Sequence, residues 1–530
     1  MSAFQTKIFY LLLTVLLSLI LLVPTLHYIP VLSTGDHGRD FYCAQQILEG
    51  KIPYHDFWWV YGPLMPYYYA LFYKMLGITM SSILVGKVVL ILICEVFFYL
   101  TLSLFAPALF ALIGTLWFLL YMNDFFFTYN HIGGVACLLG SLYYVFSYLN
   151  NDKSKYLSLS IFCLFILGLI KINFALSSLF AFIISVRAIE YFQQYPRKNL
   201  SLLIALLLGS LAGIYFLLLH SLPMYEIRQC FPYLSSDQPN QSTPVDSIRE
   251  AMTQVVLDGT ASLSNTAFTL LILMSGLFII ITCLSKKTPA NAKNFIFAGV
   301  ITLGAFYILN IHEYILSGTT YRAYWVKPVS ILLVFTLIYL ATKHLKPIIH
   351  FLLYSTLLLN IGLEVTNRYT TMQQIKRPES FLSIPRAQVY VGNEPAWIDT
   401  VQQTTNFLKT HLKSSETFFA LPYDCLYYFL TEKDSPTRQL IFFDHINIPP
   451  EQEIKIIREL EKTKVNWMVI SSRSISLETG LGKWGVSYCP LIGKYIAENY
   501  EVVAEFGPWT SLPGWAWNHG TRIMKRTGSL

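Results

Sequence analysis

Apolar runs of membrane-spanning length dominate this chain. A helix needs about 20 apolar residues to cross the hydrocarbon core of a bilayer. Of the 530 residues 54% are hydrophobic and only 13% are charged, and the mean hydropathy is +0.49. Because lipid offers no partner to backbone N–H and C=O groups, such runs fold as helices. The sequence therefore predicts a polytopic α-helical membrane protein and excludes a soluble one. We expect about eleven spans, at residues 8–28, 82–104, 106–122, 131–149, 156–170, 172–186, 200–219, 262–284, 295–311, 326–342 and 347–363.

The orientation follows from the basic residues, which gather in alternate loops and mark the cytoplasmic side. These residues are Lys7, Lys153, Lys155, Arg187, Arg197, Lys198, Lys286, Lys287, Lys293, Lys343 and Lys346. The loops between them are acidic or neutral and are expected outside. The first apolar run lacks a small-residue cleavage site and is interpreted as an uncleaved anchor. An odd number of spans then places the N-terminus in the cytoplasm and the C-terminal segment outside. The +7 net charge is spread over these loops and does not indicate a nucleic-acid partner.

The segment 377–530 differs from the membrane domain 1–376, which includes the first external loop, 29–62. Short strand-like runs and an amphipathic helix, 451–464, predict a small external α/β domain. Ile454, Ile457 and Leu460 are expected on the buried face of that helix. The strands are predicted at 417–421, 465–471, 501–505 and 521–525.

The eight cysteines show no metal-ligand spacing. Four of them would lie outside the membrane. In an oxidising compartment Cys425 and Cys489 can form a bridge, with free thiols as the alternative.

The first external loop concentrates charged and aromatic side chains. Asp36 and Asp40 are four residues apart and share a face if this stretch is helical. Arg39 lies between them, and a carboxylate beside a cation stays ionised and can act as a general base. A solvated loop with a helix cap at Asp36 is the alternative.

The following segment, 53–66, carries rings suited to stacking on sugar faces. Tyr54, Asp56, Trp58 and Tyr61 are candidate contacts to a sugar or acceptor. An aromatic belt at the membrane interface is the alternative, and the two roles are compatible.

A resemblance becomes specific at Asp36 and Gly38, followed by LEGKIPYHDFW and YGPLMPYYYALFYKMLG. This pattern, clearest over residues 30–80, resembles the GT-C superfamily of polyprenyl-phosphate-dependent membrane glycosyltransferases. More narrowly, it is similar to bacterial members related to protein O-mannosyltransferases and to the aminoarabinose transferase of lipid A. Family members commonly carry an acidic residue or Gln where this chain has His37. The departure leaves Asp36 in place but leaves only Asp40 for a second-acid or metal-ligand role.

The resemblance implies an inverting transfer at the outer face of a bacterial inner membrane, with a periplasmic C-terminal domain. An acceptor hydroxyl, deprotonated by Asp36 and supported by Asp40, would attack a sugar on a polyprenyl phosphate. The acceptor would be a glycolipid, a polysaccharide or a protein. The resemblance does not imply a particular cofactor. A divalent metal bound by Asp36 and Asp40 is an alternative for which the loop holds no complete ligand set.

Cationic side chains near the membrane are candidates for the donor phosphate, because intramembrane charge is costly and marks function. Lys171 is the first of these, and His312, Arg322 and Arg39 are the others. Snorkelling of Lys171 and a self-paired loop around His312 are the alternatives. His131, at the start of a span, is a further candidate for a sugar hydroxyl, or else an ordinary interface residue.

Two other functions stay open. A transporter or flippase of an amphiphilic or lipid-linked substrate would need a charged path at the midplane, and a polysaccharide polymerase or ligase would share the chemistry class.

Overall fold

A computed structural model of the chain describes residues 2–122, 129–194, 200–231, 290–312, 324–343, 345–442, 448–472, 483–509 and 520–528. The chain forms two compact units. The first, the helical unit, comprises Met1–Val23, Val88–Tyr215 and Ser242–Tyr369. The second, the loop–tail unit, comprises Pro24–Lys87, Phe216–Gln241 and Thr370–Leu530. The sequence predicted a single boundary, at residue 376, whereas each of these two units is built from three separate stretches of the chain.

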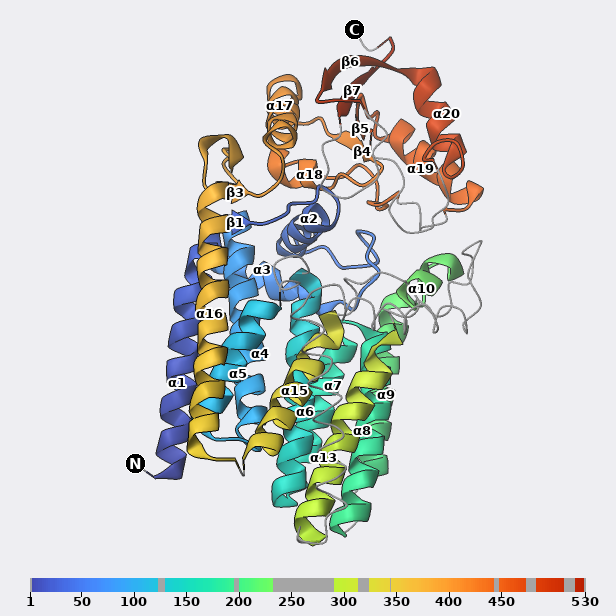
Figure 1. Cartoon of the computed structure of the whole chain (residues 1–530). Helices are drawn as coiled ribbons and strands as arrows, with labels where there is room; N and C mark the ends of the chain where they lie inside the picture. The colour runs from blue at the N-terminus through green and yellow to red at the C-terminus, as the bar shows by residue number, and fades with distance from the viewer. Residues whose placement is uncertain are drawn as a thin grey trace. The chain divides into compact units, whose positions relative to one another are not determined.

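The helical unit consists of long apolar helices that run side by side (Figure 1). Within it α6 packs on α7, α7 on α8, α8 on α13, and α1 on α5. Its helices are α1 (Ala3–Leu22), α5 (Ala108–Tyr121), α6 (Tyr129–Asn151), α7 (Lys155–Gly168), α8 (Ile172–Gln193), α9 (Leu200–Leu219), α13 (Ala290–Asn310) and α15 (Lys327–Thr342), with most of α4 (Met80–Leu102) and α16 (Pro347–Ile375).

Six helices in the described ranges are long and apolar enough to cross a membrane, and four more are apolar but shorter. They correspond to ten of the expected spans, and this confirms the predicted polytopic helical class. The remaining expected span, 262–284, lies outside the described residues.

The segment around Lys171 separates two helices. Helix α7 ends at Gly168, Lys171 is extended with φ −154°, and α8 begins at Ile172. The two helices pack against each other. The two spans predicted at 156–170 and 172–186 are therefore two helices, with Lys171 between them.

The loop–tail unit joins the segment 29–62, which was predicted to be the first external loop, to the C-terminal segment by backbone pairing. Strand β1 (Tyr28–Ile29) runs parallel to β3 (Val389–Val391), which pairs antiparallel with β2 (Phe381–Leu382). The side chain of Asn393 bonds both backbone groups of Leu32, at 2.7 and 3.0 Å. Two short helices follow β1, α2 (Asp36–Leu48) and α3 (Leu64–Leu76). The loop is therefore held by residues about 360 positions away in the sequence.

The tail contains the predicted α/β domain, a four-stranded sheet of order β4-β5-β7-β6. Strand β4 (Phe418–Leu421) is parallel to β5 (Trp467–Ser471), and β7 (Thr521–Arg526) is antiparallel to both β5 and β6 (Tyr500–Phe506). All four strand predictions are confirmed. The other tail elements are η4 (Pro378–Ser380), α17 (Pro395–His411), α18 (Leu426–Thr431), α19 (Pro450–Lys462) and α20 (Pro490–Asn499), while η1 (Val23–His27) and α10 (Met224–Cys230) lie earlier in the chain.

The buried face of α19 differs from the predicted one. Ile456 and Leu460 are buried, Ile457 packs at the edge of their cluster, and Ile454 is 41% exposed. The face turns because Glu453 faces inward, where its carboxylate accepts the Ile492 N–H at 3.0 Å.

The alternative of a Cys425–Cys489 bridge is wrong, since both thiols are free and buried. Cys425 lies at the start of α18, where its thiol contacts the Leu440 carbonyl at 3.5 Å. Cys489 belongs to the hydrophobic cluster of the sheet and α19. The two thiols therefore pack in different surroundings.

Candidate functional site

The first candidate cluster lies at the start of α2, where the backbone turn is fixed by Ser33. The Ser33 hydroxyl accepts the N–H groups of Gly35 and Asp36 at 3.2 and 3.3 Å. The Ser33 N–H in turn donates to Nδ1 of the buried His37, at 2.9 Å. Asp36 is thus the first helical residue and not the cap, and its carboxylate lies at the positive end of the helix dipole. The helix on which the Asp36–Asp40 pairing depended is confirmed.

Arg39 joins the two aspartates. Its Nη1 lies 3.2 Å from Asp36 Oδ1, and its Nη2 lies 3.0 Å from Asp40 Oδ1. The side chains of Arg39 and Asp40 are 5% and 4% exposed, whereas that of Asp36 is 20% exposed. Of the two carboxylates, Asp36 is the one that a substrate can reach. We call Asp36, Arg39, Asp40 and Tyr423 the carboxylate cluster.

The surroundings favour a permanent charge on Arg39. Its Cζ lies 5.5 Å from the Trp59 ring centroid and 5.1 Å from that of Tyr61, within cation–π range. Burial works against the charge, but Tyr423, Asp40 and the other anionic or phenolic groups nearby outweigh it and hold the pKa of Arg39 well above its ordinary value.

Tyr423 is the member of this cluster that sequence reasoning missed. It comes from the segment between β4 and α18, and its hydroxyl bonds Arg39 Nη1 at 3.0 Å and donates to Asp36 Oδ1. A Cβ added at Gly35 would lie 2.5 Å from the Tyr423 ring, and one added at Gly38 would lie 2.3 Å from the Leu426 nitrogen. These two glycines let the tail approach α2, so they are the signal that the sequence offered.

The predicted sugar contacts separate into buried and accessible side chains. Tyr54 and Trp58 are 1% and 2% exposed, the Tyr54 hydroxyl bonds the Tyr61 carbonyl, and the Trp58 indole donates to Gln229 at 3.0 Å. Tyr61 is partly exposed, and Asp56 is exposed and accepts the Ile52 N–H at 2.7 Å. Of these four side chains, only Tyr61 and Asp56 therefore offer accessible surface in this conformation.

Arg438 of the tail bonds the aromatic segment, residues 53–66. It donates to the Tyr54 carbonyl at 2.7 Å and pairs with Glu226 of α10, which is 4% exposed. Its own carbonyl accepts the Trp58 N–H at 2.9 Å. The bonds to Tyr54 and Trp58 tie the aromatic segment to the tail. The pair with Glu226 ties α10 to it, because a buried carboxylate without its partner is costly.

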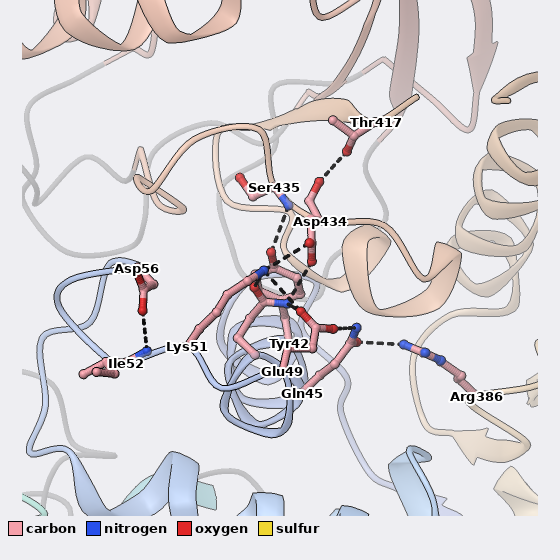
Figure 2. Close-up of polar contacts among 11 residues, drawn as sticks. Tyr42, Gln45, Glu49, Lys51, Ile52, Asp56, Arg386, Thr417, Asp434 and Ser435 are labelled. Atoms are coloured by element: carbon pink, nitrogen blue, oxygen red, sulfur yellow. Dashed lines mark hydrogen bonds and ion pairs between the residues drawn. The ribbon is translucent and has the colours of Figure 1, made fainter. Parts of the chain in front are cut away.

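The polar face of α2 is also bonded to the tail (Figure 2). Lys51 lies 3.0 Å from Asp434, and the Ser435 N–H donates to the Tyr42 hydroxyl at 2.8 Å. Arg386 donates to Gln45 at 2.7 Å. The helix that carries Asp36 is held on both sides by residues of the tail.

A second cluster lies in the helical unit, and we call it the Lys171 cluster: Lys171, Phe174, His131, His312 and Trp325. Lys171 is 8% exposed, and its Nζ lies 5.3 and 5.9 Å from the ring centroids of Phe174 and Trp325. These two rings stack at 3.8 Å, and the His312 ring lies 4.5 Å from Phe174. The structure thus brings two predicted phosphate contacts, Lys171 and His312, into one cluster.

Trp325 is the centre of this cluster and was not predicted. It is fully buried, and within the described part of the chain its indole N–H has no hydrogen-bond acceptor. The ring of His131 lies 5.8 Å away, so this predicted sugar contact belongs to the Lys171 cluster. Gly134 makes room for the indole, since a Cβ there would lie 2.4 Å from it. Arg322 lies outside the described residues.

The described residues include no group of three or more His, Cys, Asp or Glu side chains placed to hold a metal ion. The Arg39 guanidinium contacts both Asp36 and Asp40 and so takes the position between them that a cation would need. In this conformation the two aspartates do not fit a shared metal ion.

No protein-family model and no curated protein matches this sequence. Among solved structures, the chain is similar to the Archaeoglobus fulgidus oligosaccharyltransferase in complex with zinc and sulfate, with 12% identity and a TM-score of 0.46, covering 87% of this chain and 68% of that one. It is also similar to ArnT from Cupriavidus metallidurans bound to undecaprenyl phosphate, with 9% identity and a TM-score of 0.40, covering 97% of both chains. Since both TM-scores are below 0.5, the function is inferred from this chain's own side chains.

Proposed function

We propose that this protein transfers a sugar from a polyprenyl-phosphate donor to an acceptor hydroxyl, as a GT-C-type membrane glycosyltransferase. One observation carries the proposal: Asp36 is a partly exposed carboxylate at a helix N-terminus, fixed by Arg39 and Tyr423 beside aromatic rings. A general base needs this combination of access and fixed orientation. The sequence resemblance over residues 30–80 supports the same chemistry.

In this reaction Asp36 takes the proton of the acceptor hydroxyl. The acceptor oxygen attacks the anomeric carbon, the bond from that carbon to the phosphate oxygen breaks, and polyprenyl phosphate leaves with the electron pair. A single displacement of this kind inverts the anomeric centre. Asp40, which is buried against Arg39, orients Arg39 and does not meet the substrate.

We assign the donor phosphate to the Lys171 cluster, with Arg322 as a further cation. Lys171 supplies a charge, and the Trp325 indole supplies an N–H that has no acceptor among the described residues. The His312 ring lies beside Phe174, and its nitrogens bond Asn173 and the Leu309 carbonyl. Fixed donors and cations of this kind stabilise the charge that develops on a leaving phosphate. Arg39 is a less direct candidate, because its guanidinium is already engaged by Asp36 and Asp40.

The apolar helices place the protein in a membrane, and we infer the inner membrane of a bacterium from the resemblance. The basic loops then face the cytoplasm. The first loop and the tail, which fold together, face the periplasm, where a lipid-linked donor and a glycolipid, polysaccharide or protein acceptor would meet them.

The test is transfer by the purified protein in detergent from a panel of polyprenyl-phosphate sugars, with mixed glycolipid, polysaccharide and peptide acceptors. Wild type is expected to release polyprenyl phosphate, and Asp36→Asn is expected to lower the rate by about 10² to 10⁴-fold, the usual contribution of a general base. The matched control is Asp434→Asn, because Asp434 accepts from Gln46 of α2 at 3.0 Å, away from Asp36 in the helix, and is 54% exposed.

A wild-type rate in Asp36→Asn would refute the assignment of the base. If the folded protein releases no polyprenyl phosphate from any donor, but carries a lipid-linked substrate across a vesicle membrane, it is a flippase and the enzyme proposal is wrong.

A further inference from the structure

We propose that Tyr423, a residue of the C-terminal domain, positions the Asp36 carboxylate for catalysis. This inference rests on the proposed function, since it gives Asp36 the role of base. It makes the tail a part of the catalytic apparatus.

The geometry is a closed triangle of three polar groups. Arg39 Nη1 lies 3.2 Å from Asp36 Oδ1 and 3.0 Å from the Tyr423 hydroxyl, which itself donates to Asp36 Oδ1. Both contacts to the carboxylate are made at Oδ1. Two fixed bonds to one oxygen set the plane of the carboxylate, and Oδ2 becomes the oxygen that receives the acceptor's proton.

Tyr423 is suited to donate and not to act as a base itself. It is 4% exposed. Burial, opposed by Arg39 and reinforced by Asp36, holds the pKa of its phenol well above the ordinary value. The hydroxyl therefore keeps its proton at neutral pH and directs it toward Asp36.

The segment that carries Tyr423 is fixed on both sides. The Phe442 N–H donates to the Pro422 carbonyl at 2.8 Å, and the Leu426 N–H donates to the Thr34 carbonyl at 3.0 Å, two residues before Asp36. The Tyr423 ring also lies directly against Gly35, where no side chain larger than hydrogen fits. A hydroxyl held from both chain directions can position a carboxylate within tenths of an ångström, as a catalytic group requires.

The experiment compares Tyr423→Phe with Tyr427→Phe in the transfer assay. Tyr427, in the adjoining helix α18, is also buried, at 1% exposed, but its hydroxyl faces Thr521 of the sheet at 3.2 Å. Tyr423→Phe is expected to lower kcat by about 10- to 100-fold, the value of a hydrogen bond to a charged group, with the KM for donor unchanged. Tyr427→Phe is expected to keep kcat within about twofold, since each change removes one buried hydroxyl but only one of them faces Asp36.

A conservative rescue makes the test specific. Tyr423→His restores a hydrogen-bond donor and is expected to recover part of the kcat that Tyr423→Phe loses. Equal losses of kcat and thermal stability in both phenylalanine variants, without rescue by histidine, would reduce Tyr423 to a packing residue. If wild type is active, Asp36→Asn inactive and Tyr423→Phe unchanged, only the role of Tyr423 is wrong; if Asp36→Asn is active, the proposed base itself is wrong.

Discussion

The carboxylate cluster and the Lys171 cluster differ in how their charges are balanced. In the first, the guanidinium of Arg39 lies between two carboxylates, and a phenol completes the bonding. In the second, a buried lysine lies among aromatic rings, and the central indole N–H has no acceptor within the described residues. The carboxylate cluster balances its charges within the protein, while the Lys171 cluster holds an indole N–H for which the described residues offer no acceptor.

The difference indicates two kinds of site. A satisfied cluster keeps its geometry without a ligand, as a general base requires. The Lys171 cluster gains from an anion, because a bound phosphate would accept the buried Trp325 N–H and interact with the Lys171 charge. Removing the buried cation Arg39 from the first cluster should therefore lower stability, whereas removing Lys171 from the second should lower the affinity for the donor.

The largest effect is expected from Arg39→Met. Removing the cation leaves the buried Asp40 without its partner, which destabilises a protein by about 3–5 kcal/mol. Thermal unfolding of the purified protein in detergent measures this loss. Arg522→Met, which breaks a half-exposed pair with Glu505, is the control, with an expected cost below about 1 kcal/mol. Equal losses in the two variants would mean that burial does not distinguish the carboxylate cluster.

Gly38→Ala comes next and probes the contact of α2 with the tail. The added methyl group would lie 2.3 Å from a backbone nitrogen, so the segment must move, at a cost of about 1–3 kcal/mol. Gly304→Ala in α13 is the control, because its Cβ meets no atom within 4 Å and alanine favours helix. Stability and transfer should both fall in Gly38→Ala and stay near wild type in Gly304→Ala. A stable and active Gly38→Ala would contradict the tight contact.

Lys171→Met should show the opposite pattern to Arg39→Met. We expect the apparent KM for the polyprenyl-phosphate donor to rise about tenfold, equivalent to about 1.4 kcal/mol, with the melting temperature retained. Lys155→Met is the control at the other end of α7, since that lysine also lies over a ring, 5.2 Å from Tyr156. A loss of stability without a change in KM would make Lys171 a structural residue. It would contradict the difference between the Lys171 cluster and the carboxylate cluster.

The smallest effect is expected from Trp325→Phe, which removes the indole N–H and keeps a stacking ring. The loss of one among several contacts to the phosphate should raise the donor KM about three- to tenfold. Polyprenyl phosphate should also raise the melting temperature less than in wild type. Trp117→Phe, at a tryptophan stacked on Tyr121 within the same unit, controls for the lost ring. Unchanged protection by the lipid in Trp325→Phe would remove the indole from the proposed phosphate site.

The sequence was sufficient where a local pattern decides the structure. Apolar length predicted the membrane helices, strand-like runs predicted β4 to β7, and the spacing of Asp36 and Asp40 predicted a shared helical face. It was insufficient at α19, because hydrophobicity alone placed Ile454 inward while the buried Glu453 carboxylate turns the helix. It was insufficient at Cys425 and Cys489 as well, because a pair of cysteines carries no information on the distance between them.

By itself, the sequence determined the membrane class, the acidic first loop and the candidate base, since composition, periodicity and charge act over a few turns of chain. Only the tertiary structure decided which distant residues complete each cluster. Tyr423 lies 387 positions from Asp36, and Trp325 meets Lys171 only when α8 and α15 fold into one unit. Contacts of this kind depend on the packing of whole elements, and no local pattern encodes them.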